Sequence, residues 1–184
     1  MKKFLITFLL LMVSTCCFAV DKACWSSMPV YVYIPNYGYM SNWMQQAFKE
    51  WEKQSKSLVR FKFVPSPSNA NIEVEFVDFV GQCGAANNAV GCTETTTFGS
   101  GRLKKAYVTI ATKEYLRVLS NSGYSRKMVD RSKEHIYGVM LHEIGHAIGL
   151  GHSQNKKSIM YSVDLNDMQY LTNDDLMLLY NKYH

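Results

Sequence analysis

Histidine and charge are both scarce in this chain of 184 residues, which has 5 histidines and a charged fraction of 19%. The 20 lysines and arginines never form a run of five, so the sequence shows no basic patch for nucleic acid or an anionic membrane. It has no repeat, low-complexity tract or long linker that would separate domains. A hydrophobic fraction of 47% is typical of a globular protein, and the length suits one domain with its own core.

No apolar run is long enough to span a membrane, and the most apolar segment lies at the start of the chain. Residues 1–19 combine two lysines, an apolar stretch from Phe4 to Val13 and a small-residue end at Ala19, which predicts a secretory signal peptide. A membrane anchor is the alternative, but this stretch is too short to cross a bilayer as a helix. We therefore expect residues 20–184 to form one exported domain.

Cysteine is also infrequent, with five residues in the chain. Cys16 and Cys17 would leave with the signal peptide, and the sequence VSTC fits the usual lipid-attachment motif poorly. Export makes disulfides possible, and Cys83 and Cys92 flank a loop of small residues, so we predict that they pair. Cys24 is then left over, either as a free or intermolecular thiol near a mobile terminus or as a thiolate that blocks a metal site.

Apolar patterning predicts five strands and three helices. The strands cover residues 29–34, 58–64, 71–77, 93–98 and 105–111, and the helices cover 41–54, about 132–149 and the segment after Thr172. Strand 93–98 is polar and threonine-rich, which is typical of an exposed edge strand. Ser41 or Asn42 is the expected N-cap of the first helix, and Thr172 with Asp175 can form a capping box. The order of the elements predicts an α+β fold, with a mixed sheet and helices packed on it.

Three of the five histidines lie within HEIGHAIGLGH, from His142 to His152. His142 and His146 are four residues apart, and four steps of about 100° place both imidazoles on nearly the same face of a helix. Gly149 readily adopts the left-handed conformation that ends a helix, so the chain can turn back and deliver His152. Three neutral nitrogens with an open fourth position are what a catalytic zinc ion requires.

Glu143 follows the first of these histidines and is rotated from it by about 100°, so it is not placed as a ligand. It would act as general base, taking a proton as zinc-activated water attacks a carbonyl and passing it to the leaving amine. His135 lies about 10 Å from His142 along the helix axis, too far to bind the same ion. We therefore expect a packing or surface role for His135 and a solvated side chain for the C-terminal His184.

The spacing HExxHxxGxxH, followed by SIMYS at residues 158–162, resembles the metzincin metalloproteases and their Met-turn. Met160 follows His152 by eight residues, the spacing of the matrixin branch. The segments AFKEWEKQSKSLVRFKFV, NANIEVEFVD and YLTNDDLMLLYNKY are also similar to matrixins, so the likeness covers roughly residues 30–183. It implies a metzincin-like catalytic domain: a mixed, twisted five-stranded sheet with an antiparallel edge strand, two long helices packed on it and a C-terminal helix after the Met-turn.

The resemblance also implies roles for individual residues. It assigns one Zn²⁺ to the three histidines of the motif, the role of base to Glu143, and an apolar floor beneath the imidazoles to Met160. An extended peptide would add as a further strand along the edge strand, and the loop from Tyr161 to Leu171 would form the pocket for the residue after the scissile bond. The expected substrate contacts are Thr95, Thr96, Thr97, Tyr161, Ser162 and Val163.

The chain departs from animal matrixins in several respects. Ser162 stands where a proline usually follows the Met-Tyr pair, and no propeptide with a latency cysteine is recognisable before the first strand. A second histidine cluster is missing, so we expect no structural zinc ion and a stabilising role for the Cys83–Cys92 loop. Calcium ions are compatible with the family, but the sequence does not map them to residues.

We therefore predict a secreted zinc endopeptidase, extracellular or periplasmic, that acts as a monomer on protein or peptide substrates. No nucleic-acid partner is expected, and no membrane partner after removal of the signal peptide. One alternative is a secreted zinc-dependent recognition or adhesion module that turns nothing over, and another is a peptidase that trims one short peptide. Glu143 favours catalysis over binding, whereas the length of the cleft would separate broad from narrow specificity.

Overall fold

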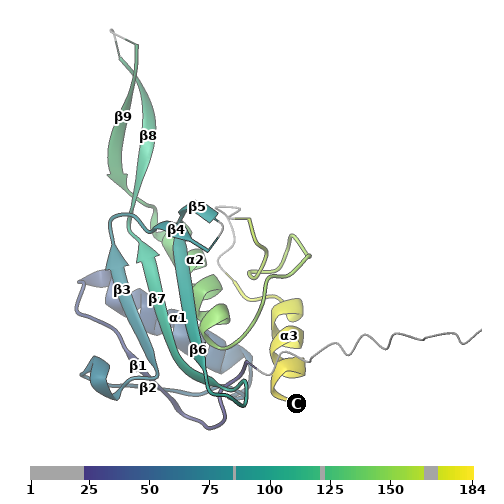
Figure 1. Ribbon diagram of the computed structural model, residues 1–184. Coiled ribbons are helices and arrows are strands. Elements are labelled where there is room, and N and C mark those ends of the chain that lie inside the picture. The colour runs from purple at the N-terminus through teal and green to yellow at the C-terminus, as the bar shows by residue number, and fades with distance from the viewer. Residues whose placement is uncertain (1–22, 85, 121–122, 164–169) are drawn as a thin grey trace, which may run out of the picture.

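The computed structural model describes residues 23–84, 86–120, 123–163 and 170–184, so the predicted signal peptide lies outside the described residues. A five-stranded sheet with helices packed against it forms the body of the molecule (Figure 1). Among the described residues, no helix combines the length and the apolar character needed to cross a bilayer.

The sheet has the strand order β2-β1-β3-β7-β6. Its strands are β1 (Val30–Tyr33), β2 (Phe61–Phe63), β3 (Ile72–Val77), β6 (Gly91–Thr97) and β7 (Leu103–Ala111). β1 is parallel to β2 and β3, and β3 is parallel to β7, whereas β6 is antiparallel to β7. The prediction of a mixed five-stranded sheet with an antiparallel edge strand is confirmed.

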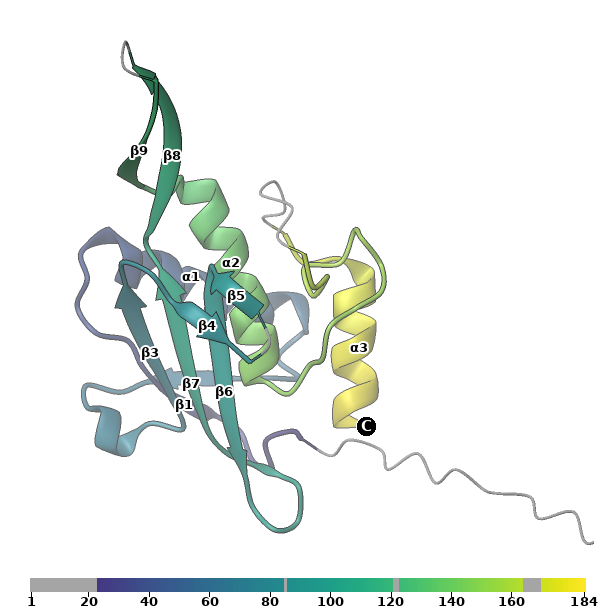
Figure 2. The ribbon, with the colours of Figure 1, turned by 45° about the horizontal axis from the view of Figure 1, so that its top comes forward.

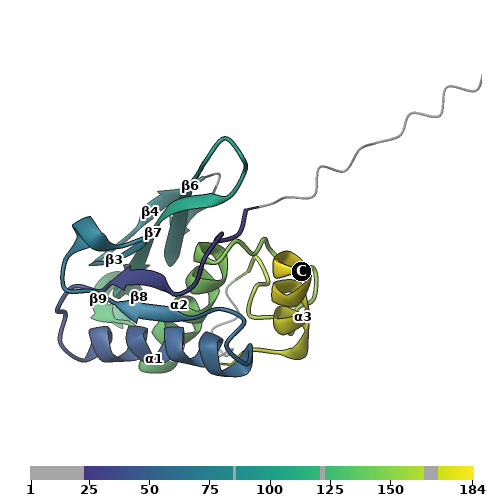
Figure 3. The ribbon, with the colours of Figure 1, turned by 90° about the horizontal axis from the view of Figure 1, so that it is seen from below.

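Alternation along β3 determines which face of the sheet is buried. Ile72, Val74 and Phe76 are at most 8% exposed. The β7 residues that pair with them are buried as well: Ala106, Val108 and Ile110. Because residues directly opposite one another share a face, these side chains form one apolar floor. The helices α1 (Tyr39–Gln54) and α2 (Lys133–Ala147) lie along this side of the sheet (Figure 3).

Helix α1 holds α2 in place through large side chains. Met44, Phe48 and Trp51 recur at helical spacing and are fully buried. Each such side chain stabilises the fold by roughly 1.5–3 kcal/mol when it leaves water. The Trp51 indole Nε1 also donates a hydrogen bond to the Leu141 carbonyl oxygen at 2.9 Å. The helix that carries the histidine motif is therefore packed against both α1 and the sheet.

The first helix begins earlier than predicted. It starts at Tyr39, directly after Gly38, whose φ of 58° is a conformation that glycine adopts readily. The predicted caps, Ser41 and Asn42, therefore lie inside the helix. The Ser41 hydroxyl instead donates to the Pro35 carbonyl oxygen at 2.7 Å, so it bonds back into the preceding loop. The prediction of either residue as N-cap was wrong, because the glycine turn starts the helix first.

The last helix, α3 (Asn173–Tyr183), has the predicted capping box. The Thr172 hydroxyl accepts from the Asp175 amide, and the Asp175 carboxylate accepts from the Thr172 amide at 2.8 Å. These bonds satisfy amide groups at the helix start that have no partner within the helix.

Two hairpins have no counterpart among the predicted strands. One is formed by β4 (Gly81–Cys83) and β5 (Ala86–Ala89), the other by β8 (Lys113–Ser120) and β9 (Gly123–Asp130). Neither belongs to the main sheet. The β8–β9 hairpin leaves the body between β7 and α2 and projects away from it (Figure 2). Strands that do not cover a core need no one-sided apolar alternation, which explains why the pattern did not reveal them.

Cys24 is a free cysteine, and its side chain is buried. It is 2% exposed, and its Sγ contacts the Arg102 guanidinium. Its carbonyl oxygen accepts a hydrogen bond from the Leu103 amide at 3.1 Å, so the chain before β1 is fastened to the start of β7. Within the described residues, the side-chain group suited to a metal ion consists of histidines without this thiol. Cys24 therefore packs in the fold as a free thiol, as one of the predictions had it, and this thiol is buried.

Candidate active site

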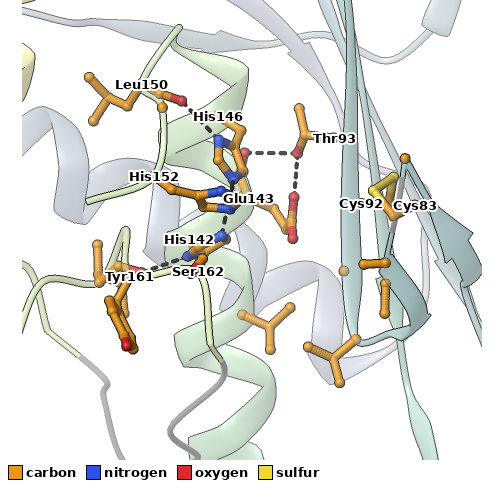
Figure 4. Close-up of a pocket in the computed structure, with 18 of the residues that line it drawn as sticks. Cys83, Cys92, Thr93, His142, Glu143, His146, Leu150, His152, Tyr161 and Ser162 are labelled. Carbon is orange, nitrogen blue, oxygen red and sulfur yellow. Dashed lines mark hydrogen bonds between the residues drawn. A yellow bond between two sulfur atoms is a disulfide. The ribbon is translucent and has the colours of Figure 1, made fainter. Parts of the chain in front are cut away.

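Helix α2 places two histidines on one face. The Ser132 hydroxyl accepts a hydrogen bond from the His135 amide at 3.2 Å, which defines the start of the helix. His142 and His146 follow on the same helix, and their Nε2 atoms are 3.0 Å apart. Both rings point into the same space (Figure 4).

The chain after α2 brings in a third histidine. The helix ends at Ala147, and Gly149 follows with a φ of 94°, in the left-handed region where glycine is unstrained. A Cβ atom at this position would lie 1.7 Å from the Ala23 carbonyl oxygen, so the packing also requires glycine. Beyond this turn, the Nε2 atom of His152 lies 3.2 Å from that of His146.

The imidazoles direct lone pairs toward one point. Nδ1 of His142 and Nδ1 of His146 lie 2.6 Å and 2.8 Å from the carbonyl oxygens of Ile159 and Leu150. A carbonyl can only accept, so each Nδ1 carries the proton and each Nε2 a lone pair. The ligand atoms of the three histidines lie within 4.8 Å of one another. Tetrahedral zinc with bonds of about 2.1 Å separates its nitrogen ligands by about 3.4 Å, so this donor set fits Zn²⁺.

Burial keeps the central imidazole neutral. Burial lowers the pKa of His146, and the neighbouring His142 and His152 act in the same direction, against the hydrogen bond to the Leu150 carbonyl, so that the pKa falls to about 4. At neutral pH the ring is therefore uncharged, which is the form of imidazole that binds a metal ion.

Glu143 is turned toward the edge strand and is not a member of the ligand group of the three histidines. The Thr93 hydroxyl of β6 lies 2.7 Å from Glu143 Oε2 and 3.0 Å from the Glu143 carbonyl oxygen. Burial raises the pKa of the Glu143 carboxyl and the hydrogen bond from Thr93 lowers it, and the pKa that results is about 7. A carboxyl group with a pKa near neutrality can both accept and return a proton.

Two residues of β6 that shape this contact were not among the expected site residues. Thr93 donates to the carboxylate, and Gly91 leaves room for it, since a Cβ atom there would lie 2.5 Å from Glu143 Oε1. A threonine-rich strand does not indicate which hydroxyl faces the helix, so the sequence offered no signal for Thr93.

Met160 lies beneath the histidine helix and is fully buried. Gly145 makes room for it, because a Cβ atom there would lie 2.2 Å from Met160 Sδ. The Asp175 carboxylate of α3 accepts hydrogen bonds from the amides of Ile159 and Met160 at 3.2 Å and 3.3 Å. Helix α3 therefore holds the peptide segment whose carbonyl oxygen orients His142.

The three histidines, Glu143 and Thr93 line a cleft with a volume of about 840 Å³. The expected substrate contacts that line it are Thr95, Tyr161, Ser162 and Val163. Thr96 and Thr97 are exposed and continue along β6 beyond the cleft lining, so the structure does not bring them to the site. Of the predicted pocket loop, residues 164–169 lie outside the described residues.

The predicted disulfide between Cys83 and Cys92 is present, and it joins the β4–β5 hairpin to β6. Both cysteines line the cleft, so the disulfide lies at its rim. His135 also lines the cleft and is buried, with its Nδ1 atom 3.4 Å from Arg131 Nη1. Its packing role is confirmed, although it packs at the site and not on the surface.

Replacing Gly149 with alanine is expected to destabilise the protein. The left-handed backbone costs an L-residue about 1–2 kcal/mol, and the new Cβ atom would also displace the Ala23 carbonyl. Gly151→Ala is the matched control in the same loop, because no atom lies within 4 Å of its Cβ position. Urea unfolding measures the free energy of unfolding of each variant, and equal values for the two variants would contradict this account of Gly149.

The raised pKa of Glu143 predicts a pH-dependent stability of the zinc-free protein. The folded-state pKa of about 7 exceeds the usual 4.5, so the contribution of Glu143 to stability is fully present below pH 4.5 and is lost as the pH rises through 7. The difference amounts to about 3 kcal/mol. Glu143→Gln should lack this component, so the gap between the two zinc-free proteins in urea unfolding should change between pH 5 and pH 8. If the free energies of unfolding of the two proteins change in parallel with pH, this pH dependence does not come from Glu143.

Comparison with known proteins places the chain in a family. The Matrixin family model matches residues 34–184, which contain the histidine motif and the Met-turn. The protein named "Putative matrix metalloproteinase" from Trichoplusia ni ascovirus 2c is 43% identical over 63 residues. That match covers 27% of this chain and 13% of the viral protein, so this chain matches only a small part of that relative. Because the family model covers most of the chain, the protein belongs to the matrixin family of zinc metalloproteases.

Proposed function

We propose that this protein is a zinc endopeptidase that hydrolyses peptide bonds in protein or peptide substrates bound along β6. One observation carries the proposal: a single cleft contains three convergent imidazole nitrogens and a buried carboxyl group outside the ligand set. A purely structural zinc site is closed by a fourth ligand and has no use for such a carboxyl group.

The positions of the side chains assign each of them a separate role in the reaction. Zinc bound by His142, His146 and His152 would supply a Lewis acid that polarises the substrate carbonyl and acidifies water. The Glu143 carboxylate accepts the proton of the attacking water and passes it to the nitrogen of the leaving amine. Thr93 holds this carboxylate through a bond of 2.7 Å, so the base does not have to reorient between the two transfers.

The edge strand offers a binding site for an extended substrate. In the part of the chain that the structure describes, β6 pairs along one side only, with β7. Its other side can bind a substrate backbone as an added strand, with Thr95 beside the cleft. Tyr161, Ser162 and Val163 line the cleft as well and would contact the side chain that follows the scissile bond.

We also propose that the protein is exported to the periplasm or the cell exterior and that it is a monomer. The disulfide between Cys83 and Cys92 supports this setting, because disulfides rarely persist in the reducing cytosol.

Metal removal tests the proposed function. The purified exported protein should contain about one zinc ion per chain and should cleave members of a peptide library, whose products report the breadth of specificity. Chelation should abolish cleavage, and about one equivalent of Zn²⁺ should restore it, because the histidines supply one open site. Cleavage that survives complete metal removal would overturn the proposal. Zinc binding without cleavage of any library member would instead favour a recognition module.

A further inference from the structure

We propose that one face of the β8–β9 hairpin is a second binding site for the polypeptide substrate, and that it holds an acidic segment of this substrate outside the cleft. The substrate as occupant rests on the proposed function, whereas the affinity of the face for acidic polypeptides does not. The two strands pair with each other and with no other strand of the described residues. The hairpin projects from the body, and its side chains from 115 to 119 and from 124 to 128 are exposed (Figures 1 and 2).

The strand register gathers large exposed side chains on this face of the hairpin. Because directly opposite residues share a face and side chains alternate along each strand, every second pair of the ladder belongs to it. We call it the arginine face, and its pairs are Tyr115–Met128, Arg117–Arg126 and Leu119–Tyr124. Its four apolar or aromatic side chains are at least 46% exposed. Exposed apolar groups that cluster in this way mark interaction surfaces.

Two arginines lie directly opposite each other on the arginine face. Arg117 pairs with Arg126 in the register, and both side chains are exposed. Like charges in directly opposite positions destabilise a pair of strands. A carboxylate between two guanidinium groups accepts hydrogen bonds from both and removes this repulsion. The arginine pair therefore favours a ligand that carries carboxylates.

The acidic residues of the hairpin lie at its base and already have basic neighbours. Asp130 lies 3.7 Å from Lys113. Glu114 lies 3.7 Å from Arg131. The sequence between these two acidic residues contains three basic residues and no acidic one. The three are Arg117, Arg126 and Lys127, and none of them forms an ion pair within the described part of the chain. The outer part of the hairpin is therefore cationic, which is complementary to an acidic polypeptide.

A stacked pair of aromatic rings connects the arginine face to the rim of the cleft. Tyr115 stacks on Phe79 with ring centroids 4.8 Å apart and 5° between the ring planes. Phe79 is four residues before Cys83, which lines the cleft, and Arg117 is two residues beyond Tyr115. Because an extended chain advances by about 3.3 Å per residue, on the order of eight substrate residues reach from this rim to the arginines. A polypeptide that leaves the cleft can therefore continue onto the arginine face.

Other occupants fit these observations less well. A second copy of the chain docked face to face would bring the arginine pairs together, and like charges oppose association. A lipid surface or a nucleic acid would match the positive charge, but neither extends from a peptidase cleft. An acidic polypeptide substrate accounts both for the unpaired arginines and for the aromatic connection to the rim.

Fluorescence anisotropy tests the binding step independently of catalysis. The probes are a labelled oligoglutamate and an oligoglutamine of the same length, added to the purified protein and to its Glu143→Gln variant, which should not cut them. We expect oligoglutamate to bind about tenfold more tightly, since each exposed arginine–carboxylate pair contributes a factor of up to about five. Raised salt should weaken this binding. The measurement needs no peptidase activity, so its failure and the failure of the proposed function are distinguishable.

Substrate kinetics test whether the arginine face acts on cleavage. Two substrates share one cleaved sequence from the peptide library and carry either a glutamate or a glutamine tail, beyond a spacer of about eight residues. The tails are placed at either end of the substrate in turn. The glutamate tail should lower KM by about tenfold at one of the two ends. It should leave kcat unchanged, because the face binds the substrate without contacting the reacting atoms.

Variants of the arginine pair connect both measurements to this face. Arg117→Gln with Arg126→Gln should make the two probes bind equally and the two tails give the same KM. Its circular dichroism and its hydrolysis of the untailed peptide should match the wild type, because both side chains are exposed and outside the cleft lining. Arg117→Glu with Arg126→Glu should instead favour a lysine tail. The matched control is Lys49→Gln with Lys53→Gln, which removes two exposed charges from α1 and should behave like the wild type.

Several results would overturn the proposal. They are equal binding of oligoglutamate and oligoglutamine, equal KM values for the two tails at both ends, and a wild-type tail effect in the Arg117→Gln, Arg126→Gln protein. Vesicles that contain phosphatidylglycerol and a single-stranded oligonucleotide provide further arms. Binding of either of them without a preference for oligoglutamate would make the face a site for lipid or nucleic acid, and the substrate assignment would be wrong.

Discussion

Glu143→Gln is expected to lower kcat for peptide hydrolysis by about 10²–10⁴-fold, the range that general acid–base catalysis contributes. The amide has nearly the shape of the carboxylate, and its oxygen can still accept the hydrogen bond from the Thr93 hydroxyl, now 2.7 Å from Oε2. It cannot take a proton from water. Because the ligand group consists of the three histidines alone, the zinc content should remain about one ion per chain.

Glu134→Gln is the matched control for this variant. Glu134 belongs to the first turn of the same helix and is exposed, so the change removes an equal charge outside the cleft. Steady-state kinetics on one peptide from the library, with zinc measured by mass spectrometry, gives both quantities. Hydrolysis by Glu143→Gln at the rate of Glu134→Gln would show that Glu143 is not the base, whereas loss of zinc would show that it acts as a ligand.

Asp175→Ala is expected to lower the free energy of unfolding by about 3 kcal/mol, because it leaves buried donors without an acceptor. The carboxylate is fully buried and accepts hydrogen bonds from the amides of Ile159, Met160 and Thr172, and from the Ser158 hydroxyl. The Ile159 carbonyl oxygen accepts from His142 Nδ1 at 2.6 Å. Loss of such outer contacts typically weakens metal affinity by about 10–100-fold, so zinc affinity should fall with stability.

Asp174→Ala is the matched control, because it removes a carboxylate from the neighbouring position of the same helix turn. Asp174 precedes Asp175 in the first turn of α3, carries the same charge and is exposed. Its replacement should change stability by less than about 0.5 kcal/mol. Urea unfolding and competition with a zinc chelator measure the two properties. Equal unfolding midpoints for the two variants would mean that the Met-turn does not depend on α3.

The histidine cluster was predictable because its geometry is local. Helical spacing brings His142 and His146 to one face, and a glycine after the helix allows the reversal that delivers His152. The structure has these three side chains together, with Nε2 atoms 3.0 Å and 3.2 Å apart. The alternation of Ile72, Val74 and Phe76 was readable for the same reason, since one strand with one buried face carries its own pattern.

The partners of these residues were not predictable, because they come from distant parts of the chain. Thr93 meets Glu143 across a separation of 50 residues, and nothing in a threonine-rich strand marks which hydroxyl points inward. The Asp175 carboxylate was expected only as a helix cap, yet it also fastens the Met-turn. The N-cap prediction at Ser41 failed on a local scale, since the positive φ of Gly38 starts the helix earlier.

The sequence by itself determined the export signal to expect, the mixed fold, the pairing of Cys83 with Cys92 and the three nitrogens suited to zinc, because each depends on short-range spacing. Only the tertiary structure decided where the carboxyl group of Glu143 lies, what holds the histidine rings in orientation, and that the β8–β9 hairpin projects from the body. Those properties depend on burial and on contacts between elements. A buried carboxyl group with a pKa of about 7 exists only once β6 has packed against α2 and excluded water.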